Sequence, residues 1–300
     1  MRVARAVACM FVAVVGIRLL AQAPQRLTFE VASVKSNKSV DPAANRGIGM
    51  PGNRFEATDL TLHELIAFGY GHPGIPFRRL LDDQIVGDQG WMTSDRFDVQ
   101  ASTGDDVVGT AAANERKLGM LRQLLADRFK LAVHHETRTA AIYVLALAHG
   151  SDKLGPGLRP SSIDCGALAA AARGGAPPTT SPAGSRPPCS AMIAFGPVTT
   201  LAGNGQPLSA LGDLLSRLTD RAIVDQTGLS GPFDIDLRFD AEGLPGVAAL
   251  VGAGRDIPHS DQTVSTLFTA LDEQLGLKLT PSRGPVDVII IDHAERPTED

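Results

Sequence analysis

Two histidine-containing stretches have the residue types for metal-assisted chemistry. His63-Glu64 begins the zinc-binding pattern H-E-x-x-H, in which two histidines one helical turn apart bind the metal, but the fifth position is Ala67. In His134-His135-Glu136 the histidines are adjacent, and a strand would point them to opposite faces of its sheet. Neither stretch predicts a zinc site, and the second is better interpreted as the polar end of a strand.

Three aspartates in the second half could line one edge for Ca²⁺: Asp234, Asp236 and Asp240. The other ligands and the glycine of an EF-hand loop are missing, so their simpler interpretation is the solvent side of a strand. Gly252-Ala253-Gly254 lacks the third glycine and the flanking strand of a phosphate loop. We keep Asp234 and Asp236 as candidate binding residues and predict no metal site and no cofactor.

The sequence also lacks the nucleophile elbow G-x-S-x-G, so no catalytic residue is predicted. Trp91 is the only tryptophan and is either a core residue or a binding contact; we keep it as a candidate binding residue. Two function classes stay open. One is a non-enzymatic binding or protein-interaction module of the cell envelope, which the missing catalytic residues favour. The alternative is a secreted hydrolase with an unrecognised site that acts on envelope or polysaccharide material.

The N-terminus is typical of a secretory signal peptide over residues 1–23. Arg2 and Arg5 precede the apolar run 6–17, and Ala21-Gln22-Ala23 matches an A-x-A cleavage site. The apolar run is too short to cross a bilayer, although retention as an uncleaved anchor is the alternative. We expect the mature chain to be periplasmic or extracellular, with no transmembrane segment after cleavage.

Charge and cysteine content follow from that cleavage. Loss of Arg2, Arg5 and Arg18 leaves 25 Lys and Arg against 33 Asp and Glu, a net charge of −8 that argues against a nucleic-acid partner. Cys165 and Cys189 remain, and in an oxidising compartment an even pair predicts a disulfide. Between them lies a stretch rich in Ala, Gly, Pro, Ser and Thr, which predicts a linker or loop.

The elements on either side of this linker recur in the same order. A shift of 146 positions places Leu208 on Leu62, and residues 271–292 on 125–146 without a gap. The stretch 222–239 likewise resembles 84–101, with offsets of 138 and 136. We interpret this as an internal duplication.

Each copy predicts strand, helix, strand, strand, helix and a closing two-strand hairpin. Thr61-Leu62-His63-Glu64 is a capping box that begins the first helix, and residues 233–239 alternate apolar and acidic or basic side chains as a half-buried strand does. The stretch 281–285, Pro-Ser-Arg-Gly-Pro, predicts the turn of the last hairpin. The fold class is therefore α+β: two similar units, each with two helices packed on a mixed or antiparallel sheet, related by a pseudo-twofold axis.

Several motifs together resemble a known family. They are FEVASVK (29–35), RFEATDLTLHELIAFGYG (54–71), IVGDQGWMTSDRFDV (85–99), MLRQLLADRFKLAVHHETR (120–138) followed by YVLALA, the cysteine pair, VDQTGLSGPFDIDL (224–237) and LFTALDEQLGLKL (267–279). The chain resembles a family of exported bacterial proteins of unknown function that is expanded in soil bacteria. It departs from the family at AHGSDKLG (148–155) and at Arg138-Thr139-Ala140-Ala141, where members usually have a Lys-rich stretch and Arg-Glu-x-Pro.

The resemblance implies no catalytic residue, because the family carries no established activity. Some relatives are attached to membrane sensor peptidases of the antibiotic-response type, which implies extracytoplasmic sensing or binding. The second half is also similar, in pattern only, to the interaction domains at the periplasmic entrance of secretins and of signalling outer-membrane receptors. We expect a partner that is an envelope protein or ligand.

These observations divide the chain into four regions. We predict a signal peptide over 1–23, a first α+β unit over 24–160, a linker closed by the disulfide over 161–190, and a second α+β unit over 191–300. The copies differ in the Trp91 segment and in the insertion 241–262, so we expect function there and in the groove between the units.

Overall fold

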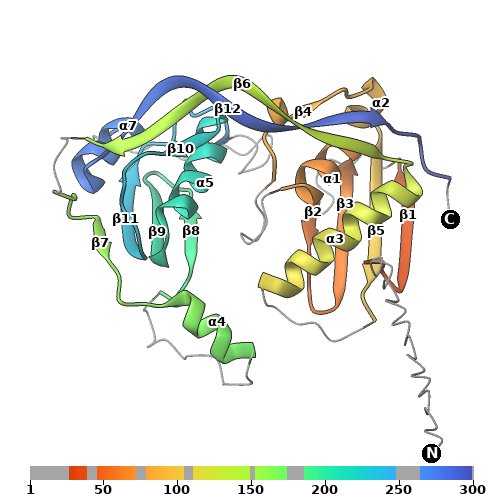
Figure 1. Cartoon of the computed structure of the whole chain (residues 1–300), viewed down its shortest axis with the longest axis horizontal. Helices are drawn as coiled ribbons and strands as arrows, with labels where there is room; N and C mark the ends of the chain where they lie inside the picture. Colours follow the sequence, from red (N-terminus) through yellow and green to blue (C-terminus); the bar gives the residue numbers. More distant parts are fainter. Residues whose placement is uncertain are drawn as a thin grey trace, which may run out of the picture.

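The computed structural model describes residues 27–38, 46–71, 79–104, 111–148, 153–173, 186–247 and 264–298. Two lobes lie side by side beneath a pair of very long strands that run across both of them (Figure 1). We call these two strands the strap. The predicted signal peptide and most of the insertion 241–262 lie outside the described residues.

Lobe 1 is a four-stranded antiparallel sheet in the order β1-β5-β3-β2, covered by helices. Its elements are β1 (Val31–Asn37), β2 (Gly47–Gly49), β3 (Arg54–Thr61), α1 (Leu62–Gly69), η1 (Asp82–Gln84), β4 (Ile85–Val86), α2 (Gly90–Ser94), β5 (Arg96–Ser102) and α3 (Ala111–Arg128).

Lobe 2 repeats this arrangement with the strand order β7-β11-β9-β8, again antiparallel. Its elements are β7 (Leu158–Pro160), α4 (Cys165–Arg173), β8 (Ala191–Ala194), β9 (Thr199–Gln206), α5 (Leu208–Thr219), β10 (Ile223–Asp225), β11 (Phe233–Phe239), α7 (Leu267–Ala270) and the π-helix η2 (Leu271–Leu275). Two of these elements bear on the predicted boundaries. β7 precedes the boundary at 160 yet lies in this sheet, and α4 is a helix within the predicted linker 161–190.

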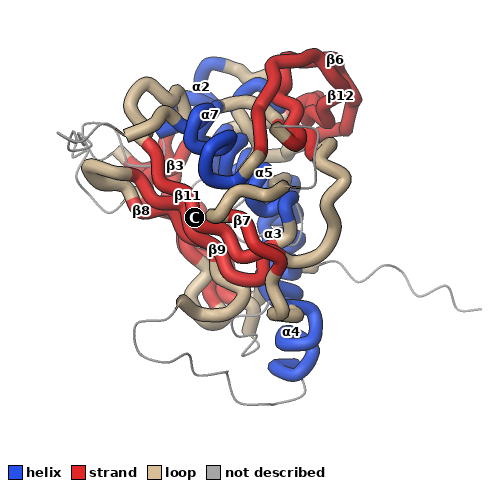
Figure 2. The backbone as a smooth tube through the Cα atoms, turned by 90° about the vertical axis from the view of Figure 1, so that its left-hand side faces the viewer, coloured by secondary structure: helices blue, strands red, loops and turns tan. Residues whose placement is uncertain are grey.

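The strap consists of β6 (Ala132–Leu147) and β12 (Leu277–His293), which pair antiparallel along their whole length. β10 of lobe 2 adds to β6 in parallel, and β4 of lobe 1 adds to β12 in parallel, giving the order β10-β6-β12-β4. In the turned view of Figure 2 the two strap strands lie beside each other, above the sheet of lobe 2.

The predicted closing hairpins are wrong, since β12 continues through Pro281 and Pro285 without a turn. The two prolines are four residues apart, so their missing N–H groups fall on the same side of the strand. Among the described strands β12 has a second neighbour only at Ile289–Ile290, which leaves an edge where proline is tolerated.

Several sequence predictions of local structure are confirmed. Thr61 caps α1, with both hydrogen bonds of the capping box to Glu64 present. α5 begins directly after Pro207, and Gly276 ends η2 in the left-handed conformation. β11 alternates buried and partly exposed side chains along its length.

Each lobe has its own apolar core, and the strap contributes to both. In lobe 1, Phe97 and Phe129 pack edge to face with ring centroids 5.1 Å apart, and Ile291 of β12 is buried against them. In lobe 2, Phe233 and Phe239 are buried together with Leu145 of β6 and Leu277 of β12. The protein is an α+β fold with two cores that share two strands.

Candidate functional site

Trp91 lies in α2 and packs partly buried against the core of lobe 1. Its indole Nε1 donates a hydrogen bond to Gln89 Oε1 at 2.9 Å, and the guanidinium carbon of Arg296 lies 5.1 Å from its ring centroid. Arg296 also donates to Asp95 Oδ2 at 2.8 Å. Trp91 thus holds the C-terminal segment on lobe 1, and a binding role for it stays a prediction.

Asp234 and Asp236 both hold neighbouring segments of lobe 2. Asp234 Oδ1 accepts a hydrogen bond from the backbone N–H of Gly205 at 2.9 Å. Asp236 accepts from Arg159 at 3.1 Å through Oδ2 and from Arg186 through Oδ1. These carboxylates tie β7 and the segment around Arg186 to β11, and their predicted binding role is not tested by these contacts.

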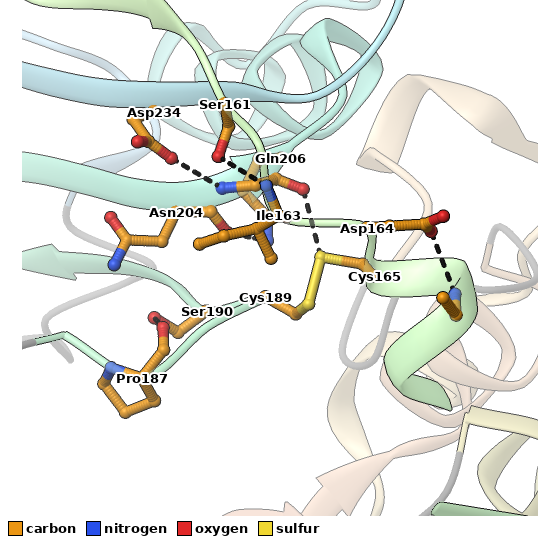
Figure 3. The surroundings of a disulfide bond; sticks show 12 residues. Ser161, Ile163, Asp164, Cys165, Pro187, Cys189, Ser190, Asn204, Gln206 and Asp234 are labelled. Atoms are coloured by element: carbon orange, nitrogen blue, oxygen red, sulfur yellow. Dashed lines mark hydrogen bonds between the residues drawn. A yellow bond between two sulfur atoms is a disulfide. The ribbon is translucent and has the colours of Figure 1, made fainter. Parts of the chain in front are cut away.

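The predicted disulfide between Cys165 and Cys189 is present, with Cα atoms 5.6 Å apart. It joins the first residue of α4 to the segment before β8, and Cys165 Sγ lies 3.1 Å from the carbonyl oxygen of Gly205 (Figure 3). Asp164 caps α4 by accepting from the N–H of Ala167 at 2.9 Å. The bridge therefore fixes the start of α4 to the segment that leads into β8, close to the end of β9.

A cavity of about 720 Å³ opens on lobe 2 beside Phe268, whose side chain is 39% exposed. We call it the Phe268 cavity. Among the described residues Phe268 and Leu154 give it an apolar part, and its polar side chains are those of Lys153, Thr269, Asp272 and Glu273. Such a mixture of an exposed aromatic ring with hydrogen-bonding groups is typical of ligand sites.

Aromatic side chains continue from this cavity onto the strap. The ring of Tyr143 lies 5.7 Å from that of Phe268, tilted by 58°. The guanidinium carbon of Arg221 lies 5.2 Å from the centre of the Tyr143 ring. Phe268 is thus supported from one side and exposed on the other.

The floor of the Phe268 cavity is backbone that cannot easily move. Gly155 N–H donates to Leu275 O at 2.9 Å, and Ala148 N–H donates to Gly276 O at 2.9 Å. A Cβ on Gly155 would lie 2.3 Å from Gln274 O, so the two segments approach closely only because this residue is glycine. These backbone contacts fix the glycine-lined part of the cavity.

Two of its carboxylates, Asp272 and Glu273, project from the π-helical turn η2. π-helical turns are rare and are frequent at functional sites, because the wider turn re-aims the side chains it carries. Glu273 is further held by Ser265, whose hydroxyl donates to Oε2 at 2.9 Å.

Lobe 1 has a cavity of about 410 Å³ in the corresponding place, between the segment before β1 and α3. Gln123 and Asp127 line it, 146 positions before Thr269 and Glu273. The residue 146 positions before Phe268 is Arg122, and the aromatic ring that lines this smaller cavity is instead the partly buried Phe29.

Ionisable groups of the two lobes interact electrostatically around Asp83. Partial desolvation raises the pKa of Asp83 in η1, the negative charges of Asp220 and Asp82 raise it further, and Arg221 opposes the rise. Asp220 and Arg221 follow α5 in lobe 2, so lobe 2 influences the protonation of a carboxyl group in lobe 1. A functional groove between the units stays a prediction.

His63 forms a second ionisable cluster nearby in α1. Its Nδ1 lies 2.6 Å from Asp88 Oδ2, and its Nε2 lies 3.4 Å from Asp82 Oδ1. The hydrogen bond with Asp88 is the largest cause that raises the pKa of His63, and burial opposes it. His134 and His135 contact different partners, Asp292 and Asp287.

Within the described ranges no three His, Cys, Asp or Glu side chains are grouped so that they could hold a metal ion. None of the helices in these ranges is long and apolar enough to cross a membrane.

The sequence did not predict the Phe268 cavity. It also did not predict the ionisable group formed by Asp82, Asp83, Asp220 and Arg221, which we call the Asp83 cluster. Phe268 was part of the predicted second helix of the second unit, and nothing in a helical pattern distinguishes an exposed aromatic from a core one. Asp83 and Asp220 come within electrostatic range because β4 and β10, which follow them in sequence, both pair with the strap. The predicted closing hairpins contain no such pairing.

Fold and cavity together define a two-lobed α+β protein with a surface cavity on its second lobe. The chain belongs to the family described as Protein of unknown function (DUF3738), whose family model matches residues 63–294. Comparison with curated proteins and with solved structures gave no match.

Proposed function

We propose that the protein is an exported, non-enzymatic binding module of the cell envelope, and that its ligand or partner contacts the Phe268 cavity. One observation carries the proposal: an aromatic ring stands 39% exposed at the edge of a cavity of about 720 Å³. Large exposed aromatics in preformed hollows are where binding energy concentrates.

The envelope location rests on the sequence. The signal peptide predicted over residues 1–23 would export the chain to the periplasm or beyond, where the disulfide would be stable. The resemblance to relatives carried by membrane sensor peptidases, and the weaker one to secretin and receptor entrance domains, both favour a binding role.

We further infer that the two lobes are copies of one unit, related by a pseudo-twofold axis through the strap. The register of the strap supports this, because Thr139 lies opposite Pro285 and the two are 146 positions apart, the offset between the copies. Ile85 pairs with Ile289 as Ile223 pairs with Tyr143, so each short strand meets the other copy's strap strand. In this duplicated unit the second copy carries the larger of the two cavities, which supports a specific site there.

The test uses the mature chain, residues 24–300, immobilised and exposed to envelope extract. Wild type should retain a ligand or partner that the Phe268→Ala protein loses. Met192→Ala is the matched control, because Met192 is 52% exposed in β8 and lies outside the cavity. Equal retention by wild type and Phe268→Ala would contradict the assigned site.

Export is tested separately by the intact mass of the secreted protein. Cleavage should follow Ala23. A chain that still begins at Met1 would show retention as an anchor instead.

A second candidate function is hydrolysis of envelope or polysaccharide material, and the Asp83 cluster favours it. A carboxyl group with a raised pKa beside a second carboxylate is the arrangement that general acid catalysis uses. If this function holds, purified mature protein should release reducing sugar from polysaccharide, and Asp83→Asn should abolish the release. If wild type releases no reducing sugar, hydrolysis is excluded as a function for these substrates and binding is the proposal that remains.

A further inference from the structure

We propose that the Phe268 cavity binds a neutral oligosaccharide of roughly two or three sugar rings. This inference rests on the proposed function and names the class of ligand. The cavity volume of about 720 Å³ lies in the range of roughly 300–1,000 Å³ that small-molecule sites occupy.

The aromatic side of the cavity suits one face of a sugar. A pyranose ring presents a face of C–H groups with slight positive polarisation, and the face of an aromatic ring is negative. Phe268 offers such a ring, supported by Tyr143 at 5.7 Å. Leu154 extends the apolar surface.

The polar side of the cavity suits the hydroxyl rim of the same sugar. Lys153 supplies donors, Asp272 and Glu273 supply acceptors, and the hydroxyl of Thr269 can do both. The Ser265 hydroxyl holds one oxygen of Glu273 at 2.9 Å, and a carboxylate keeps further lone pairs for a second donor. Hydrogen bonds from sugar hydroxyls to carboxylates are charge-assisted and hence among the stronger ones.

The same lining disfavours other ligand classes. Among the described lining residues two carboxylates accompany one lysine, which disfavours phosphate and other anions. An acyl chain would bury the polar side chains without giving them hydrogen bonds, which is costly.

An extended peptide would find the backbone N–H groups of the two lining glycines already hydrogen-bonded. Gly155 N–H already bonds Leu275 O, Gly276 O already accepts from Ala148, and Gly276 N–H bonds Asp272 O at 3.0 Å. Strand addition needs unpaired backbone groups, so recognition here must go through side chains. Because this backbone is fixed in advance, a ligand would not have to order it.

The experiment measures binding of two soluble trimers to the mature chain by titration calorimetry and by chemical-shift perturbation. One is the β-1,4-linked glucose trimer and the other is the β-1,4-linked N-acetylglucosamine trimer, so that a glucan source and a wall-glycan source are distinguished. We expect at least one to bind, and Phe268→Ala to weaken that binding by about tenfold or more, as loss of a central aromatic contact does. Phe268→Trp should stay within about threefold of wild type, because it keeps an aromatic face.

Glu273→Gln should weaken the same binding by about threefold to tenfold, since it removes the charge from an acceptor. Met192→Ala should bind as wild type does, and equal thermal midpoints would show that every variant is folded. Absence of binding by both trimers would overturn the inference, as would undiminished binding by Phe268→Ala. A third outcome separates this inference from the proposed function. If neither trimer binds, but wild type retains an envelope protein from extract that the Phe268→Ala variant does not retain, this inference is overturned and the proposed function stands.

Discussion

The two lobes share a strand order but differ at the second helix, and the cavity lies at that difference. In lobe 1 this helix is the 18-residue α3, whereas in lobe 2 it is four residues of α7 followed by the five-residue π-helix η2. Lobe 2 also carries the disulfide and α4 between its first two strands. The same strand order is therefore compatible with a long regular helix in one lobe and a short helix followed by a π-helical turn in the other.

The largest effect expected from the comparison of the two lobes is the loss of stability when a core phenylalanine is truncated at corresponding positions. Phe97→Ala and Phe233→Ala should each lower the free energy of unfolding by about 3–5 kcal/mol, because both side chains are buried. The Phe97 variant should lose roughly 0.5–1.5 kcal/mol more, through its edge-to-face contact with Phe129. Urea denaturation of both variants measures this. A cost below about 1 kcal/mol at Phe233 would mean that the positions are not equivalent.

Loss of the disulfide should affect lobe 2 alone. The bridge spans a sequence separation of 24, for which the chain-entropy relation gives about 3 kcal/mol. The double variant Cys165→Ser, Cys189→Ser should unfold at lower denaturant and be cut by protease between the two positions. Unchanged hydrogen exchange in lobe 1 is the matched control. Protection lost equally from both lobes would contradict an effect confined to lobe 2.

A smaller effect concerns a left-handed residue just beyond the second helix in each lobe, two residues after α3 and directly after η2. It is Lys130 with φ 51° in lobe 1, and Gly276 with φ 70° in lobe 2, 146 positions later. Lys130→Gly should stabilise the protein by up to about 1 kcal/mol, because glycine adopts this backbone without strain.

The reverse change in lobe 2 should have the opposite sign. Gly276→Ala should cost about 1–3 kcal/mol, since its Cβ would lie 2.9 Å from Lys153 O. Thermal unfolding should show a higher midpoint for Lys130→Gly and a lower midpoint for Gly276→Ala. A shift in the same direction for both variants would contradict the explanation from backbone conformation.

The smallest effect is a dependence of stability on pH that arises from His63 in lobe 1. The pKa of His63 is raised in the folded protein, chiefly by Asp88, so the protonated ring stabilises the fold below its ordinary pKa of about 6.5. That contribution is lost as pH rises through the higher folded pKa.

Ser209 occupies the corresponding position in lobe 2 and cannot titrate there. His63→Gln should therefore cost about 1 kcal/mol at pH 5.5 and less at pH 8.5, measured by denaturant unfolding at both pH values. Ser209→Ala is the control and should show the same cost at both. A His63→Gln cost that grows with pH would contradict the assignment.

Local structure was predictable where a few neighbouring residues decide it. Thr61 and Glu64 satisfy each other's backbone at the start of α1, and Gly276 has the freedom that ends η2. The Cys165–Cys189 pair followed from the compartment and the count of cysteines.

Long-range pairing was not predictable in the same way. Pro281 and Pro285 flank Ser-Arg-Gly and satisfy every local rule for a turn, but β12 stays extended because β6 offers it a partner along its whole length. For the same reason the sequence could not place Arg221 on Tyr143, or Asp83 near Asp220.

The shared strap has a consequence for how the chain acquires its structure after synthesis. The core of lobe 1 needs Ile291 and Ala294, which lie more than 160 positions after Phe129 (291 − 129 = 162), and Glu295 N–H donates a hydrogen bond to Phe129 O at 2.7 Å. A chain that emerges N-terminus first must therefore leave the first lobe unfinished until its final strand arrives. Contacts so distant in sequence close slowly and leave apolar surface open meanwhile. Removal of the C-terminal strand should thus unfold the N-terminal lobe, although almost the whole of that lobe's sequence would remain.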